Sequence, residues 1–341
     1  MARKRNYNLD FLKILACIAV VGLHTLQKDL SWINSSLYYL CGFAVPSFFM
    51  ASGYVLLNRN SVTWDYVMHK IIAILRVVII WNIIALVYEL VKNIAIYNNS
   101  GFEILMIPKE IVKSLLQRGM FWQFWYFGAL IIIYFLLPAL RNFARVKDIK
   151  RLWIIFVGFS IIIQGASIIV GKPLQKNVIQ TFRIWSWIQY FVLGGILFCS
   201  ETTYWGKKIS SITMKTHTIL LFVWSGLVVL YQNISGRYLI HNLYAEYFYD
   251  SIFTIVWLFL IFTFVMRLKF SGKCYGIIEK MVPLTMGIYI VHPLYMKIIT
   301  RFIAIDKIWM SIVYFVVVLV VSGVTVFIGN KIVFTRKMFQ L

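Results

Sequence analysis

Charged residues are scarce in this sequence, and acidic residues are the scarcest. Only 13% of the 341 residues are charged, and 12 residues in all are Asp or Glu. A soluble domain carries about a quarter of its residues as charges, so this shortage excludes water as the main solvent of the chain. Apolar residues take their place, since 61% of the residues are hydrophobic and 17% are aromatic. The composition therefore indicates an integral membrane protein.

Cysteine is also rare. The four cysteines, which show neither CxxC nor metal-ligand spacing, are Cys17, Cys41, Cys199 and Cys274. This spacing gives no support to a zinc site or a catalytic dithiol, and thiols in or beside apolar segments are expected to act as small packing residues. No metal is expected in the function.

Long apolar segments recur from residue 9 to residue 330, with no polar stretch long enough to fold separately. Roughly 20 apolar residues in a helix cross a hydrocarbon core of about 30 Å. The sequence therefore predicts an all-α, polytopic membrane protein of about ten transmembrane helices, with residues 1–341 in a single membrane domain. The predicted segments are 9–26, 37–57, 71–92, 122–140, 152–170, 185–199, 217–232, 247–266, 283–302 and 309–330. The sixth and seventh are short enough to be tilted or partly re-entrant.

Lys and Arg residues set the orientation of these segments. The loops and ends that would face the cytoplasm hold 20 Lys and Arg, and the opposite loops hold 9. Cytoplasmic loops carry the excess of basic residues, so both termini are predicted to be cytoplasmic in a multi-pass protein of a bacterial-type plasma membrane. The net charge of +22 is then explained by an inner surface facing anionic membrane lipid, and no nucleic-acid partner is expected.

The first segment carries two ionisable side chains on one face. Asn8 is expected to cap this helix, and Asp10 in its first turn suits the positive end of the helix dipole. Lys13 and His24 are eleven residues apart, which places them within about 20° of one another and roughly 16 Å apart along the axis. Ionisable groups inside a membrane span often mark a substrate path. The alternatives are a hydrogen-bonded interhelical histidine and a lysine that extends to the membrane surface.

These residues resemble the opening signature of the acyltransferase-3 family of membrane-bound acyltransferases. That signature is LDxLR, followed after ten residues by a histidine, and here Leu9, Asp10 and Lys13 precede His24 with the same spacing. Lys13 stands where the family usually has Arg, which keeps the charge but loses the planar fork. Further stretches resemble later family signatures in the right order: 45–54, 70–76, 124–127 with Pro138, and 287–293.

The resemblance implies a single transmembrane acyltransferase domain. The implied reaction transfers an acyl group, most often acetyl from acetyl-CoA, to a hydroxyl of a cell-envelope glycan or a lipid-linked glycan. His24 is the candidate base, or alternatively the group that accepts the acyl chain covalently. Lys13 and Arg76 are candidates to bind the phosphates of the acyl-CoA donor, although Arg76 also suits a positive-inside anchor. The pantetheine arm is expected to enter a cavity between the helices, joining an inner donor mouth to an outer acceptor mouth.

Other residues of the matching stretches are candidates for supporting roles. Asp10 and Ser52 join His24 as candidate catalytic residues, although Ser52-Gly53 also suits close helix packing. Tyr289 and His292 are candidates for structural or catalytic support. The remaining histidines, expected to be solvated or interfacial, are His69, His217 and His241.

Aromatic residues and carboxylates gather on the predicted outer side. The candidates for binding the acceptor are Trp122, Trp125, Glu246 and Asp250, accompanied by Trp185 and Trp187. Aromatic faces with a few carboxylates suit a sugar, and the alternative for the tryptophans is the aromatic belt of a membrane interface. The competing function is export or flipping of a polysaccharide or lipid-linked glycan, which ten helices with internal His and Arg would also serve.

Overall fold

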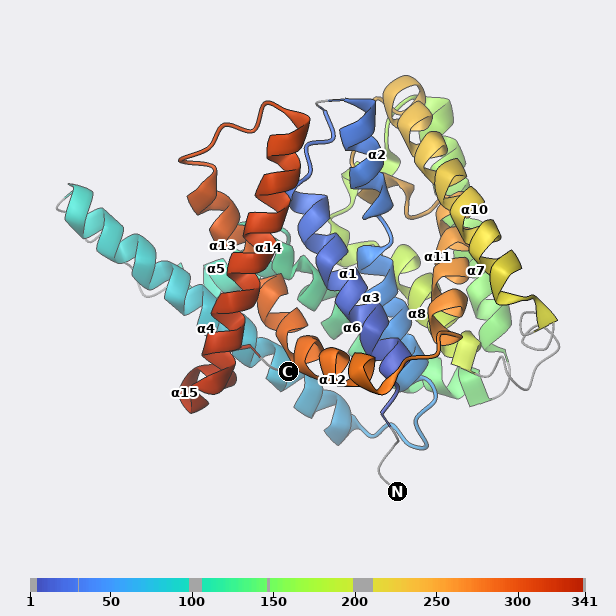
Figure 1. The fold of residues 1–341 in the computed structure, drawn as a ribbon. Helices are drawn as coiled ribbons and strands as arrows, with labels where there is room; N and C mark the ends of the chain where they lie inside the picture. Colours follow the sequence, from blue (N-terminus) through green and yellow to red (C-terminus); the bar gives the residue numbers. More distant parts are fainter. Residues whose placement is uncertain (1–4, 30, 98–105, 146–147, 199–210, 340–341) are drawn as a thin grey trace.

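The computed structural model describes residues 5–29, 31–97, 106–145, 148–198 and 211–339 (Figure 1). The described residues are 81% helical and contain no strand. The prediction of an all-helical membrane protein is confirmed. By length and composition, eight helical stretches among the described residues are able to cross a membrane, and the two shorter apolar helices, Ile184–Phe198 and Ile252–Met266, coincide with the sixth and eighth predicted segments.

The main helices follow the ten predicted segments in order, with two segments divided or extended by shorter helices. They are α1 (Tyr7–Thr25), α2 (Trp32–Leu40), α3 (Ala44–Leu56), α4 (Trp64–Tyr97), α6 (Trp125–Arg145), α7 (Ile149–Val170), α8 (Ile184–Phe198), α10 (Met214–Ile234), α11 (Ile252–Met266), α13 (Thr285–Ile299) and α14 (Ile308–Lys331). Figure 1 shows α1 beginning and α14 ending at the same end of the bundle. This arrangement agrees with the even number of crossings that the charge distribution predicts.

The second predicted segment is not one helix. A turn at residues 41–43 separates α2 from α3. The turn allows Pro46 to fall in the first turn of α3, where its missing N–H leaves no helical hydrogen bond unmade. The second crossing therefore consists of two short helices with a break near its middle.

Four predicted segments or loops differ in the structure. Helix α4 has 34 residues, about 51 Å at the usual rise, and takes in part of the predicted inner loop 58–70. The predicted outer loop 93–121 contains α5 (Met106–Leu115), an amphipathic helix. The seventh segment is not short, because α10 continues into a π-helical turn, Ser235–Leu239. The inner segment 267–282 contains α12 (Gly272–Met281), which lies across the end of the bundle in Figure 1.

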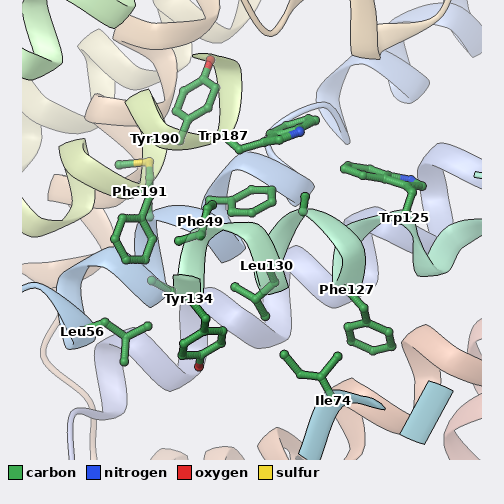
Figure 2. Close-up of a cluster of buried hydrophobic side chains, with 14 of the residues drawn as sticks. Phe49, Leu56, Ile74, Trp125, Phe127, Leu130, Tyr134, Trp187, Tyr190 and Phe191 are labelled. Atoms are coloured by element: carbon green, nitrogen blue, oxygen red, sulfur yellow. The ribbon is translucent and has the colours of Figure 1, made fainter. Parts of the chain in front are cut away.

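The centre of the core lies where α3, α6 and α8 meet. Figure 2 shows the aromatic and aliphatic side chains that fill it, among them Phe49, Phe127, Trp187 and Phe191, which are all at most 1% exposed. Helices α3 and α8 approach each other backbone to backbone. A Cβ on Gly53 would lie 1.7 Å from the Phe191 carbonyl oxygen, so only glycine permits this contact. A Cβ on Gly194 would similarly lie 1.9 Å from the carbonyl oxygen of Met50.

The outer faces of the bundle remain apolar. Only 17% of the apolar stretch of α7 and 22% of that of α14 are buried inside the protein. Exposed side chains on these helices include Ile155, Ile162 and Val320. Because every backbone polar group inside a helix is already bonded, such faces are stable in lipid, and the pattern supports direct contact with membrane lipid.

Candidate functional site

The inner end of α1 is fixed by a group of polar contacts. Asn6, rather than the predicted Asn8, caps the helix by accepting a hydrogen bond from the Leu9 N–H at 3.1 Å. Asp10 forms ion pairs with Arg5 at 2.7 Å and with Lys13 at 3.4 Å. The carboxylate therefore holds the two cations at the start of the helix, and it does not line the cavity described next.

A cavity of about 770 Å³ runs beside α1, from Lys13 near one end of the bundle to Lys28 near the other. Its walls come from α1, α3, α6, α13 and the loops before α8 and α11. The structure brings seven of the candidate residues to this one space: Lys13, His24, Ser52, Trp122, Trp125, Glu246 and Tyr289. The predicted cavity between the helices is therefore present, and its length along α1 is comparable to the spacing between Lys13 and His24.

His24 lies between two rings in the wall of this cavity. Its imidazole meets Trp122 edge to face, with ring centroids 4.8 Å apart. On another side it stacks on His292, with centroids 5.3 Å apart and an interplanar angle of 15°. Within the described chain, no hydrogen bond fixes either nitrogen of His24. The ring is thus oriented by packing, and its nitrogens are available to a bound molecule.

His292 is fully buried, and its tautomer follows from its surroundings. Its Nδ1 donates to the Ile288 carbonyl at 3.0 Å. Pro293, which follows, has no N–H to donate to the Tyr289 carbonyl. A neutral imidazole that donates from Nδ1 carries its lone pair on Nε2. This Nε2 is buried and has no hydrogen-bond partner within the described residues.

Hydroxyl groups from α3, α6 and α13 line the cavity. Ser52, Tyr126 and Tyr289 are all in its lining. Tyr289 donates its hydroxyl hydrogen to the Gln123 carbonyl. The Ser52-Gly53 pair thus has a divided role, because Gly53 packs on α8 whereas Ser52 faces the cavity.

A carboxylate at the Lys28 end of the cavity is held in place by two neighbouring side chains. Glu246 forms an ion pair with Arg183 at 3.3 Å and accepts a hydrogen bond from Gln180. Burial raises the pKa of the Glu246 carboxyl, and the positive charge of Arg183 opposes this rise. Trp122 and Trp125 line the same space, so the structure joins three of the four residues predicted for the acceptor.

Asp250, Arg76 and Asp10 lie outside the cavity lining. Asp250 is 1% exposed and accepts hydrogen bonds from Ser186 at 2.5 Å and from Gln175 and Trp185 at 3.2 Å. These donors come from the loop before α8 and from α8 itself. The carboxylate therefore joins the loop at 244–251 to its neighbours. Arg76 is exposed on α4.

Several residues at this site were not singled out from the sequence. Gln123 and Arg183 are ordinary members of apolar or loop stretches, and only the fold brings Gln123 to the cavity and Arg183 to Glu246. Tyr126 lies in the matching stretch 124–127 but was given no role. Lys28 could have been found from the sequence, because it lies only three residues after the end of α1, the helix that carries His24. The expectation for His217 is wrong, since it is 2% exposed, and its Nε2 lies 3.1 Å from the Leu260 carbonyl oxygen.

Comparison with known proteins assigns the chain to a family. The family model described as an acyltransferase domain, that of the acyltransferase-3 family, matches residues 6–329. An amino-acid racemase of Enterococcus faecalis is 24% identical over 339 residues, which are 94% of this chain and 45% of that protein. A serine/alanine racemase of Enterococcus gallinarum is 27% identical over 154 residues, which are 42% of this chain and 21% of that protein. No solved structure matches the chain.

The chain thus spans less than half the length of both racemases it matches. The family model, in contrast, covers nearly the whole chain, including the stacked pair His24 and His292 and both lysines at the ends of the cavity. Together with the helical membrane architecture, this match shows that the chain belongs to the acyltransferase-3 family of membrane acyltransferases.

Proposed function

We propose that this protein transfers an acyl group, most often acetyl, from acyl-CoA to a hydroxyl of a cell-envelope glycan or lipid-linked glycan. The observation that carries the proposal is the cavity beside α1, in which His24 lies between a lysine at each end. In such a cavity the donor and the acceptor can enter from opposite ends and meet at the imidazole of His24. The predicted orientation places the Lys13 end toward the cytoplasm, where acyl-CoA is made.

The chemistry requires a base, because a thioester is already activated but a hydroxyl is a weak nucleophile. In the direct route a nitrogen of His24 takes the hydroxyl proton while the oxygen attacks the thioester carbonyl. The tetrahedral intermediate then collapses, the carbon–sulfur bond breaks, and the CoA thiolate receives the proton from the imidazolium. In the covalent route the His24 nitrogen attacks the thioester carbonyl, the carbon–sulfur bond breaks and the CoA thiolate leaves. The hydroxyl oxygen then attacks the acyl-imidazole carbonyl, the carbon–nitrogen bond breaks, and the hydroxyl proton passes to the CoA thiolate.

The outer end of the cavity supports a sugar as the acceptor. Indole faces from Trp122 and Trp125 accompany the carboxylate of Glu246, and the ring of Tyr244 lies 4.1 Å from the Lys28 ammonium. Carbohydrates bind proteins through such a mixture of flat apolar rings and hydrogen-bonding groups, since each sugar ring has an apolar face and a polar rim. The fixed geometry of Glu246 suits an acceptor of hydroxyl hydrogen bonds.

The decisive experiment measures transfer of labelled acetyl from acetyl-CoA by the purified protein in the presence of envelope glycans. Labelled glycan is the expected result. The competing exporter would instead move glycan across the membrane of a reconstituted vesicle without modifying it, so the same preparation is assayed for transport. Racemisation is the weaker candidate, because more than half of each named racemase lies outside the part that this chain matches.

A further inference from the structure

Two arginines converge at the Lys13 end of the cavity, just beyond the end of α3. Asn58 fixes this end by donating to the carbonyls of Tyr54 and Gly195, both at 3.1 Å. The next residue, Arg59, places its guanidinium 4.1 Å from the centroid of the Tyr66 ring. Arg141, near the end of α6, donates from Nε to the Arg59 carbonyl oxygen at 2.9 Å. Two arginines, one following α3 and one on α6, are thus held next to each other.

This pair adjoins the cavity through Tyr134. Tyr126, Leu130 and Tyr134 are spaced four residues apart on α6, and all three line the cavity. Figure 2 shows Leu130 and Tyr134 projecting from this helix, on the same side of the view as Leu56 of α3. Arg141 follows Tyr134 by seven residues on α6, so it lies about two turns further along nearly the same face of the helix. The row on α6 therefore leads from Ser52 and Tyr126, in the middle of the cavity, down to the arginines.

The charges at this end favour an anion. Among the described residues, no carboxylate forms an ion pair with Arg59, whereas Lys13 is engaged by Asp10. Arg76 is exposed on α4 and is not part of this pair; none of the three arginines is in the cavity lining itself. A guanidinium binds phosphate through two parallel hydrogen bonds, which a lysine ammonium does not do. Both arginines belong to segments predicted to be cytoplasmic, the side on which a nucleotide-bearing donor arrives.

We propose that Arg59 and Arg141 bind the phosphates of the CoA nucleotide, an inference that rests on the proposed acyl-CoA function. The donor then lies along one path: its phosphates at the two arginines, its pantetheine arm beside the apolar row on α6, and its thioester toward His24. Arg59 and Arg141 take the phosphate-binding role that the sequence assigned to Arg76. Lys13, deeper in the cavity, faces the inner part of the same donor.

The test measures dissociation constants on the detergent-solubilised full chain with three probes: CoA, dephospho-CoA and pantetheine. Arg59→Gln and Arg141→Gln are each expected to weaken CoA binding about tenfold or more, because each removes a charge-assisted contact to phosphate. Pantetheine binding is expected to stay unchanged, since it carries no phosphate. Arg151→Gln is the matched control, because Arg151 is 85% exposed in the same inner segment and pairs with Asp148.

The outcomes separate the two proposals. If the wild-type protein does not bind CoA, the acyl-CoA function fails and this inference fails with it. If wild type binds CoA, but Arg59→Gln and Arg141→Gln bind it as tightly as Arg151→Gln does, the phosphate site is elsewhere and the acyltransferase proposal stands. Equal losses for CoA and pantetheine would also overturn the inference, since they indicate a damaged fold. Arg59→Lys keeps the charge and is expected to retain part of the affinity that Arg59→Gln loses. This variant therefore distinguishes loss of the charge from loss of the fold.

Discussion

Replacing His24 is the most direct test of the proposed chemistry. The imidazole has no hydrogen bond within the described chain, so its structural contribution comes from two ring contacts, with Trp122 and His292. Contacts of this kind stabilise a fold by about 0.5–1.5 kcal/mol each, so His24→Ala loses about 1–3 kcal/mol of folding free energy. A general base contributes about 10² to 10⁴ in rate, or about 2.7–5.4 kcal/mol of activation free energy. Loss of activity should therefore exceed any loss of stability.

The matched variant is His24→Phe, which keeps a ring for both contacts but has no nitrogen. Turnover with acetyl-CoA, CoA binding and thermal unfolding are measured on one detergent-solubilised preparation of each variant. We expect His24→Phe to unfold near the wild-type temperature, to bind CoA normally and to lose transfer by at least a hundredfold. His24→Ala should show the same loss of transfer with a somewhat lower unfolding temperature.

A folded His24→Phe protein that retains near-normal transfer would remove His24 from the mechanism. If that variant also moved glycan across a vesicle membrane, export would become the better interpretation. A variant that fails to fold despite keeping its ring would instead show that the nitrogens of His24 serve the structure. In that case the absence of a hydrogen bond to His24 would be misleading.

Three further predictions follow from the structure. Lys13→Arg should retain transfer and Lys13→Glu should weaken acetyl-CoA binding, measured as donor affinity; equal affinities would contradict a donor role. Gly53→Ala should lower the unfolding temperature sharply or abolish folding, because its Cβ would overlap the α8 backbone, whereas Gly226→Ala, with open space around it, should be silent. In a cysteine-free background, an external thiol reagent should label intact cells carrying Lys109→Cys but not Lys150→Cys; the reverse pattern would invert the topology.

Much of the fold was predictable because a membrane-spanning helix requires a long run of apolar residues, and such runs can be read directly from the sequence. Nine of the ten predicted segments contain one main helix each, and the second contains a pair. The break at residues 41–43 escaped prediction because Pro46 follows an apolar run that reads as continuous. Helix α5 escaped because its apolar residues recur at helical spacing over only ten residues, too few for a span.

Helical periodicity predicted only the part of the site that lies on one helix. Lys13 and His24 share a face of α1, whereas Ser52 and Tyr289, which also line the cavity, were candidates because of the resemblance to the family. The two rings that contact His24 belong to Trp122 and His292, about 100 and 270 positions away in the sequence. No local sequence pattern predicts that these two side chains contact the same imidazole. Arg59 and Arg141 looked like ordinary members of basic loops, because their convergence depends on how α3 and α6 end.

The close contact between α3 and α8 has a mechanical consequence. Because each helix rests on the other's backbone at Gly53 and Gly194, with no side chain between them to rearrange, the two move as one stiff unit. Helix α3 supplies one wall of the cavity, at Phe48 and Ser52, so that wall is expected to be stiff. Widening or closure of the cavity is therefore expected to involve helices that do not rest on the α8 backbone, such as α13. Because His24 is on α1 and His292 is on α13, a shift of α13 relative to α1 would change the stacking of the two imidazoles.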